Sequence, residues 1–390
     1  MGTLRDKVVI AGVGYTKFGE LWEKNQQDLL VEAVFEALDD AGVEPKDIEA
    51  GWVGIQYPFT GVSAGAAVEP LKMYGIPFTR VENFCASGMD AFRNACMAVA
   101  SGVYDLVLAC GVEKLMDQGS RGLPSTTGAM GVAFDRPSAP AMFALAASRC
   151  FEEHGWTKET LANVPVKNHE NGTHHPKAHF RKAITIDDVL NAPIISWPLG
   201  RYDCCAMSDG SAALIITTPE RARSLKHKDD FVKVKANEIS VYTLYPWLHP
   251  EYDFLGFPST QQAARSAYKQ AGIKDPAKEI DVAECHDCFS ITEILNTEDL
   301  GFCKKGQGGD FIKEGNTKYG GLIPINVSGG LKCFGHPIGA TGCRMLVEIS
   351  KQLQGRADGL QVKDPKLALA HNLGGAFTVA SVTILGRNDT

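Results

Sequence analysis

Apolar and polar positions alternate along this chain in two sets that follow the same order. In each set, a strand-like run precedes an amphipathic helix and a short apolar strand, and then come a helix rich in small residues and two further strands. The expected strands are 8–13, 52–56, 105–110 and 211–217, then 231–236, 281–285, 366–370 and 378–385; the expected helices are 27–41 and 87–101, then 260–272 and 340–353. The ordered repetition favours duplication of one α/β unit over chance similarity.

The alternation of strands and helices predicts an α/β fold with mainly parallel sheets covered by helices. The two sets differ mainly in the connection between their last two strands, because the first set carries the insertion 116–207 there. The insertion is rich in Gly, Pro, Ser, His and Asn around an apolar helix near 139–154, a composition typical of binding loops. We therefore predict a first half (1–115 and 208–225), an inserted loop domain (116–207) and a second half (226–390).

Composition narrows the class of protein. The 390 residues are 44% hydrophobic and 22% charged, as in globular proteins, and the net charge of −7 argues against nonspecific nucleic-acid binding. No apolar run reaches the ~18 residues of a membrane span, and the strand near Lys7 leaves no room for a targeting peptide. The last residues, Gly386 to Thr390, carry no retention or peroxisomal signal. We expect a cytoplasmic protein whose 11 cysteines are reduced.

Cys85 is the first candidate for chemistry. It follows an expected strand and stands at the start of the helix 87–101. The amides at a helix start stabilise an anion, so a thiolate there is expected to have a lowered pKa and to be a better nucleophile. The alternative is a buried structural cysteine.

His336 occupies the equivalent place in the second half, inside a Gly-His-Pro-Ile-Gly turn. An imidazole there could take the proton of a thiol or polarise a carbonyl group. A turn histidine bonded only to the backbone is the alternative.

A third cluster is the segment 284–289, with sequence Glu-Cys-His-Asp-Cys-Phe. His286 and Cys288 could supply a histidine donor and a second thiol at a strand end, or the segment could be a packed strand end with a surface Asp287. Cys285 and Cys288 form a lone CxxC, and because no further ligands follow at matching spacing we expect no metal.

Two glycine motifs need opposite interpretations. The run Asn372-Leu373-Gly374-Gly375 closes the strand 366–370, where glycine amides could point at an oxyanion or merely form a bulge. Gly12-Val13-Gly14 follows a strand but has Lys17 where a dinucleotide fingerprint needs a third glycine, so we reject it as a nucleotide site.

In combination, three of these motifs resemble those of the thiolase superfamily, in order and spacing across essentially the whole chain. They are 83–88 (Asn-Phe-Cys-Ala-Ser-Gly), 286–289 (His-Asp-Cys-Phe) and 335–342 (Gly-His-Pro-Ile-Gly-Ala-Thr-Gly). Conventional thiolases have Asn-Glu-Ala-Phe at 286–289 and Cys-x-Gly at 372–374. The His-Asp-Cys-Phe form resembles the sterol-carrier-protein-type and archaeal-type thiolases, and 2-benzoylsuccinyl-CoA thiolase is one example. The fold implied is a five-layered α-β-α-β-α core with an inserted loop domain.

The resemblance implies a reaction and a role for each motif residue. The reaction is thiolytic cleavage of a 3-oxoacyl-CoA, or the reverse Claisen condensation, through an acyl group on Cys85. His336 would activate Cys85 and, with His286 or a water, bind the thioester enolate oxygen. Cys288 would be the acid/base, and the amides of Cys85 and Gly374 would bind the tetrahedral oxyanion. Because Asn372 replaces the usual second cysteine, this chemistry depends on Cys288 reaching the α-carbon.

Coenzyme A is expected as a substrate, with no permanently bound cofactor. Its phosphates could pair with a basic stretch of the insertion, Lys167, Lys177, Arg181 and Lys182, unless that stretch is only a solvated loop. An aromatic segment could line a pocket for a bulky acyl chain or could simply pack. Its members are Tyr242, Tyr245, Trp247, Tyr252, Phe254 and Phe257.

By resemblance we expect a homodimeric core and, as a hypothesis, a small partner protein with an OB fold and a zinc ribbon. Two rival functions remain: an aldolase on the same fold without an acyl-enzyme, and a non-catalytic subunit that binds acyl-CoA. The presence of Cys85 argues against the first. The joint presence of Cys85, His286, Cys288 and His336 argues against the second.

Overall fold

A computed structural model describes residues 3–57, 63–118 and 138–390. The first half begins with β1 and closes with β7 and α7, after the insertion. Its elements are β1 (Val9–Tyr15), α1 (Gln26–Ala41), β2 (Ala50–Gly54), α2 (Gly65–Leu71), β3 (Phe78–Val81), α3 (Ser87–Ala100), β4 (Leu106–Lys114), β7 (Asp209–Thr217) and α7 (Pro219–Ala222). Those of the described insertion are α4 (Ala139–His154), α5 (Lys158–Thr173), α6 (Ile186–Leu190), β5 (Ile194–Ser196) and β6 (Leu199–Gly200).

The second half repeats the pattern with extra short helices. Its elements are β8 (Val232–Val241), α8 (Pro258–Ala271), α9 (Pro276–Glu279), β9 (Val282–Cys285), α10 (Ser290–Asp299), α11 (Gly308–Lys313), α12 (Gly330–Phe334), α13 (Ile338–Leu353), β10 (Leu367–Gly374) and β11 (Val379–Gly386). All twelve strands and helices of the predicted repeat are therefore present, with ends shifted by a few residues.

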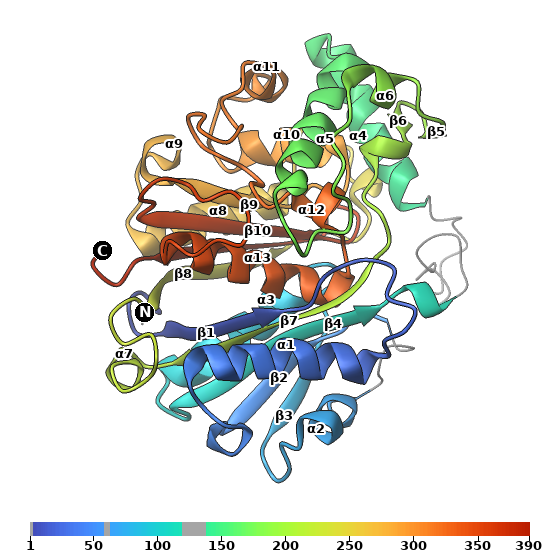
Figure 1. Ribbon diagram of the computed structural model, residues 1–390. Helices are drawn as coiled ribbons and strands as arrows, with labels where there is room; N and C mark the ends of the chain where they lie inside the picture. The colour runs from blue at the N-terminus through green and yellow to red at the C-terminus, as the bar shows by residue number, and fades with distance from the viewer. Residues whose placement is uncertain (1–2, 58–62, 119–137) are drawn as a thin grey trace.

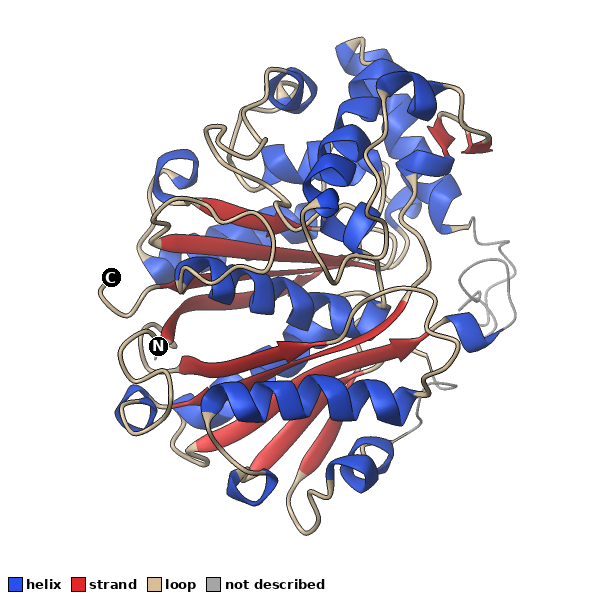
Figure 2. Ribbon diagram, viewed as in Figure 1, coloured by secondary structure: helices blue, strands red, loops and turns tan. Residues whose placement is uncertain are grey.

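The order of the layers is set by which helices cover each face of the strands. Helices α3 and α13 lie between the two halves of the strand system, α1 covers the outer face of the first half, and α8 covers that of the second (Figure 1). The resulting α-β-α-β-α order is the expected one, and Figure 2 shows the strands enclosed by helices. Helix α13 is buried along its entire length, which fits its central place. Within the described residues, no helix is both long and apolar enough to cross a membrane.

The prediction of mainly parallel sheets is wrong. The strand order is β3-β2-β4-β7-β1-β8-β11-β10-β9, and only β2–β3, β2–β4 and β9–β10 run parallel, against five antiparallel pairs. Strand β11 returns antiparallel to β10 through a tight turn, and β7 returns antiparallel to β4 after the insertion. Bonds between β1 and β8 at Val9 and Ile10 join the two halves into one hydrogen-bonded system.

The described insertion packs on the second half. Helix α5 contacts α11 and also α10 and α12, which flank the motifs around His286 and His336. Hence the inserted region adjoins the candidate site, as expected of a binding domain.

Candidate active site

Cys85 stands on a tight turn between β3 and α3. Phe84, immediately before it, has a φ of 51°, which non-glycine residues rarely adopt. The Ser87 hydroxyl holds this turn, because it donates to the Phe84 carbonyl oxygen at 2.5 Å and accepts from the Asn83 amide at 2.9 Å. The turn presents the half-buried Cys85 side chain away from the helix that follows.

Glycines let the two halves approach at the site. A Cβ added to Gly88, in the first turn of α3, would lie 2.6 Å from the carbonyl oxygen of Gly339 in α13. Side chains larger than hydrogen would force these helix starts apart. The close approach brings the Cys85 turn against the turn that carries His336.

His336 is buried and its ring is held by Thr341. The ring Nδ1 lies 2.7 Å from the Thr341 hydroxyl, which itself donates to the Pro337 carbonyl oxygen at 2.9 Å. Since that hydroxyl proton is already used, Thr341 accepts from His336, so Nδ1 carries the ring proton. The other nitrogen, Nε2, is left with a free lone pair, the state needed to accept a proton.

His286 follows β9, and its hydrogen bond favours the opposite tautomer to that of His336. The Asn372 side-chain amide nitrogen donates to His286 Nδ1 at 2.7 Å, so this ring carries its proton on Nε2. The two rings lie edge to face, with centroids 5.2 Å apart. One histidine is therefore arranged as a proton acceptor and its neighbour as a hydrogen-bond donor.

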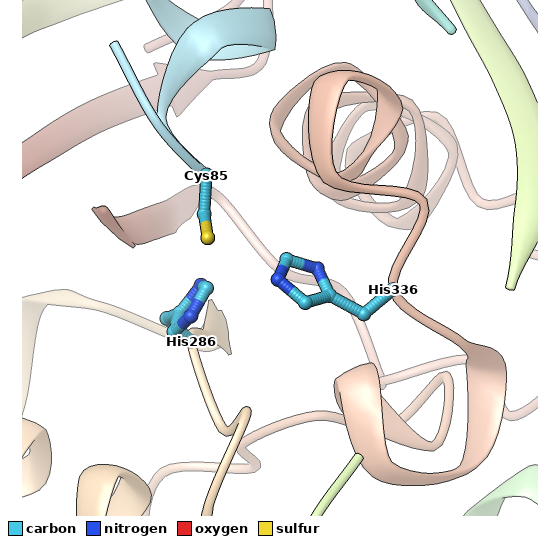
Figure 3. Close-up of side chains that lie close together, drawn as sticks. All are labelled: Cys85, His286 and His336. Carbon is cyan, nitrogen blue, oxygen red and sulfur yellow. The ribbon is translucent and has the colours of Figure 1, made fainter. Parts of the chain in front are cut away.

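The three side chains converge from three separate chain segments (Figure 3). The Cys85 sulfur and one ring nitrogen each of His286 and His336 all lie within 4.8 Å of one another. Since Nδ1 of each ring is engaged by Asn372 or Thr341, the Nε2 atoms are the ones that face the sulfur. Such an arrangement can pass a proton from sulfur to imidazole and hold an oxygen between two rings.

Electrostatics reverse one expectation about Cys85. Burial raises the pKa of the thiol to about 12, and the amides of Gly375 and Cys85 that favour the thiolate do not offset it. Burial, reinforced by the nearby Arg344 cation, lowers the pKa of His336 to about 3. The expectation of a lowered thiol pKa is thus wrong, because desolvation outweighs the helix start. The resting pair is a neutral thiol beside a neutral imidazole.

This neutral pair predicts the pH dependence of alkylation. With its pKa raised, Cys85 carries even less thiolate at neutral pH than a free thiol of pKa ~8.5. The rate of Cys85 modification by iodoacetamide, followed by peptide mass spectrometry, should rise about tenfold per pH unit from pH 7 to 9 without levelling off. A small free thiol serves as control and should level off near its own pKa. A rate that is flat from pH 6 to 8 would instead reveal a thiolate–imidazolium pair.

The two cysteines of the CxxC point to different places. Cys285 lies in the core with its sulfur 3.8 Å from His371 Nδ1. Cys288 is buried beside the site, where its carbonyl oxygen accepts from the Cys205 amide at 2.8 Å. Burial raises the pKa of Cys288, and the charges of Cys205 and Cys85 raise it further, which places its thiol near both. The CxxC is therefore not a chelate, and the Cys288 thiol lies close enough to Cys85 for their charges to interact.

Asp287 is not the surface residue considered as an alternative. It is fully buried and accepts from the amides of Leu331 and Lys332 at 2.6 and 3.2 Å. Asn168 of α5 also donates to it at 2.7 Å. Asp287 thereby ties the His286 segment to α12, which leads directly into His336.

Gly374 lies against the Cys85 turn, as its expected role requires. A Cβ at Gly374 would sit 2.8 Å from the Asn83 carbonyl oxygen and 3.2 Å from the Cys85 nitrogen. The amide that acts on the Cys85 sulfur in the structure, however, is that of the next residue, Gly375.

The four basic candidates for CoA separate into two kinds. Lys167 is buried and its ammonium contacts Glu293 Oε1 at 2.9 Å and the Ile325 carbonyl at 2.7 Å. Lys177 binds Glu36 at 2.8 Å and the Tyr15 carbonyl at 2.6 Å. Neither ammonium is free for a phosphate. Arg181 and Lys182 are exposed.

The described aromatic side chains of 242–257 largely pack together. Phe257 and Tyr252 are buried, and both lie against Phe377, with ring centroids 5.2 and 6.0 Å away. The Trp247 side chain falls outside the described part of the structure. This packing favours the interpretation as core over a pocket lining.

Three contributors were not singled out from the sequence. Thr341 and Gly375 belong to motifs named above, but their roles depend on hydrogen bonds that only the folded structure brings about. No spacing in the sequence identifies a hydroxyl or a backbone amide with such a role. Cys205 follows Cys204 in the insertion, and only the fold brings it to Cys288.

Family models and relatives identify the family of this chain. The description "Thiolase, N-terminal domain" matches residues 8–220, and "Thiolase C-terminal domain-like" matches residues 246–387. An acetyl-CoA acetyltransferase of Methanothermobacter thermautotrophicus is 41% identical over 98% of this chain and 100% of its own. Sterol carrier protein 2 of Oryctolagus cuniculus is 34% identical over 97% of this chain and 72% of its own. This chain belongs to the thiolase family.

Solved structures share the fold. The Ltp2–ChsH2(DUF35) aldolase matches with a TM-score of 0.85 at 26% identity over all of both chains. The Acat5 thiolase from Ascaris suum, in complex with coenzyme A, matches with a TM-score of 0.71 at 18% identity, over 98% of this chain and 100% of its own. The protein is a thiolase-type acyltransferase, as the sequence predicted. The aldolase and the non-catalytic subunit are not favoured.

Proposed function

We propose that the protein transfers an acetyl group through Cys85, cleaving a 3-oxoacyl-CoA with CoA or running the reverse Claisen condensation. The observation that carries this proposal is the convergence of the Cys85 sulfur with one nitrogen each of His286 and His336. The acetyltransferase relative supports acetyl as the group transferred.

In the first step of the condensation direction, the Cys85 sulfur attacks the thioester carbonyl of acetyl-CoA while its proton passes to Nε2 of His336; cleavage follows the same steps in reverse. Because the resting thiol is neutral, proton transfer accompanies attack. We assign the oxyanion to the amides of Cys85 and Gly374. The position of Gly374 against the Cys85 turn and the action of the Gly375 amide on the Cys85 sulfur support this assignment. Collapse expels the CoA thiolate and leaves acyl-Cys85.

In the second step, a carbon nucleophile forms from the other thioester. The CoA thiolate, once expelled, takes up the thiol proton of Cys288, whose charge interacts with that of Cys85, and the Cys288 thiolate then removes the α-proton. The enolate oxygen lies between the two imidazoles and accepts from Nε2–H of His286. His336, protonated after the first step, supplies the other donor. The enolate carbon attacks the acyl carbonyl, the bond to the Cys85 sulfur breaks, and that sulfur takes its proton back from His336.

The CoA phosphates are assigned to Arg181 and Lys182, and Lys167 and Lys177 are left out because both are engaged. The loop before these residues is fixed on α12, since the amides of His179 and Phe180 donate to the carbonyls of Phe334 and Cys333 at 3.0 and 2.9 Å. This attachment supports a place for the phosphates near α12, which leads into His336.

A substrate panel tests the function and the acyl group. Acetoacetyl-CoA should be cleaved with CoA, whereas a 3-oxo thioester with an aromatic chain should react at least tenfold more slowly, because the aromatic segment is packed. The readout is CoA-dependent loss of the 3-oxo thioester. Faster cleavage of the aromatic ester would restore aromatic degradation as the function, and no cleavage of any ester would contradict the proposal.

We also propose a cytoplasmic homodimer that acts with a small OB-fold, zinc-ribbon partner. The edge strand β3 has an open side on which a second copy could pair. The Ltp2–ChsH2(DUF35) structure supports a partner, and eleven free cysteines support a reducing compartment. Failure of the two proteins to co-elute after co-expression would end the partner hypothesis.

A further inference from the structure

The active-site trio has the donor set of a soft-metal site. It offers one thiol sulfur and two imidazole nitrogens within 4.8 Å of one another, and it is the one such group of three found among the described residues. Cysteine and histidine are the ligands that Zn²⁺ prefers, whereas Mg²⁺ and Ca²⁺ prefer oxygen. We propose that Cys85, His286 and His336 form a reversible binding site for Zn²⁺ or a similar soft divalent cation, which blocks the nucleophile.

The geometry needs only a small contraction. With bonds of ~2.3 Å to sulfur and ~2.0 Å to nitrogen, tetrahedral ligand atoms lie about 3.5 Å apart. No pair of these atoms, which lie within 4.8 Å of one another, need therefore close by more than about 1.3 Å, and rotation of the half-buried Cys85 side chain would bring its sulfur toward the rings. A water would complete the tetrahedron, as in zinc sites with three protein ligands.

The residues behind the rings suit metal binding. His336 Nδ1–H is bonded to Thr341, which leaves Nε2 as a ready ligand. His286 must shift its proton from Nε2 to Nδ1, and Asn372 can accommodate this. Among the residues that the structure describes, the buried side-chain oxygen of Asn372 has no hydrogen-bond partner, so a half-turn of the amide would present that oxygen to Nδ1–H.

The charge around the site permits a cation. Arg344 is neutralised by Glu284 at 2.6 Å, and the Glu113 and Glu82 carboxylates act on Cys85. On coordination the Cys85 S–H bond breaks, its proton leaves to solvent, and the sulfur electron pair forms the bond to the metal. No oxidation or reduction occurs.

Cobalt gives a direct test, because a cobalt–thiolate bond produces a charge-transfer band. Co²⁺ added to reduced, metal-free protein should bind one ion per chain with that band and a tetrahedral visible spectrum, and Zn²⁺ should displace it. The band should vanish in Cys85→Ala, and the concentration for half-saturation should rise at least tenfold in His336→Ala and His286→Ala. The half-buried Cys303 provides the control for ordinary thiols, so Cys303→Ser should bind as the wild type does.

The proposal is overturned if the wild type shows no band, if Cys85→Ala keeps it, or if both histidine variants bind unchanged. Wild-type protein alkylated on Cys85 after folding should also lose the band. This measurement replaces the Cys85→Ala variant if that variant does not fold. None of these measurements uses substrate, so they stand apart from the proposed reaction. Acetylation of Cys85 by acetyl-CoA before Co²⁺ is added should also prevent metal binding, and this expectation does rest on the proposed reaction. If acetyl-CoA leaves metal binding unchanged, the acyl-enzyme is contradicted and the metal site is not.

Discussion

The Cys85→Ala variant is expected to cleave acetoacetyl-CoA at least about 10⁴-fold more slowly than the wild type. Alanine has no sulfur to form the covalent intermediate, and neither histidine can replace it. The structure places the sulfur where both rings face it, so the loss should fall on turnover rather than on substrate binding. Steady-state kinetics of 3-oxo thioester loss provide the measurement.

A cysteine of the same helical segment gives the matched control. Cys96 is fully buried in α3, and its thiol interacts with the Asn237 side chain. Cys96→Ala should keep turnover within a few-fold of the wild type. A Cys85→Ala variant that retains a tenth of wild-type turnover would show that no acyl-cysteine is needed.

The Cys288→Ala variant is expected to lose about 10²–10⁴-fold in overall cleavage, the usual contribution of a general acid–base group. Its thiol adjoins Cys85 and is kept neutral by burial, so it can donate or return the α-proton. Transfer of an acetyl group from acetyl-CoA to Cys85 needs no α-proton and should survive. Measuring both half-reactions separates the two roles.

Cys285→Ala is the matched control, because it removes the other sulfur of the CxxC. That sulfur faces His371 in the core, so overall cleavage should stay within a few-fold of the wild type. Equal losses in both variants would point to a packing effect. An unaffected Cys288→Ala variant would show the acid–base assignment to be wrong.

The element order and the convergence of the three motifs could be predicted from the sequence, because both depend on local or ordered signals. The 3.6- and 2-residue periods placed α1 and α13 within two residues of their observed ends. The relative direction of neighbouring strands could not be predicted in this way. A buried strand such as β11 has the same apolar pattern whether it pairs parallel or antiparallel with β10, and the structure shows the antiparallel pairing.

Site details failed where they depend on burial. Cys85 stands at a helix start, and that local feature favours a thiolate, but desolvation by residues from both halves decides its pKa. Lys167 reads as a surface base, yet Glu293, far along the chain, pairs with it in the core. The aromatic segment is equally compatible with a pocket until Phe377 is seen to pack against it.

The central claim is that Cys85 itself carries the acyl group. The most direct measurement is the intact mass of the protein after mixing with acetyl-CoA in the absence of free CoA, followed by peptide mapping. One added acetyl group per chain is expected, on the peptide that contains Cys85, and it should be removed when CoA is supplied. An unmodified protein, or an acetyl group on another residue while Cys85 stays free, would contradict it.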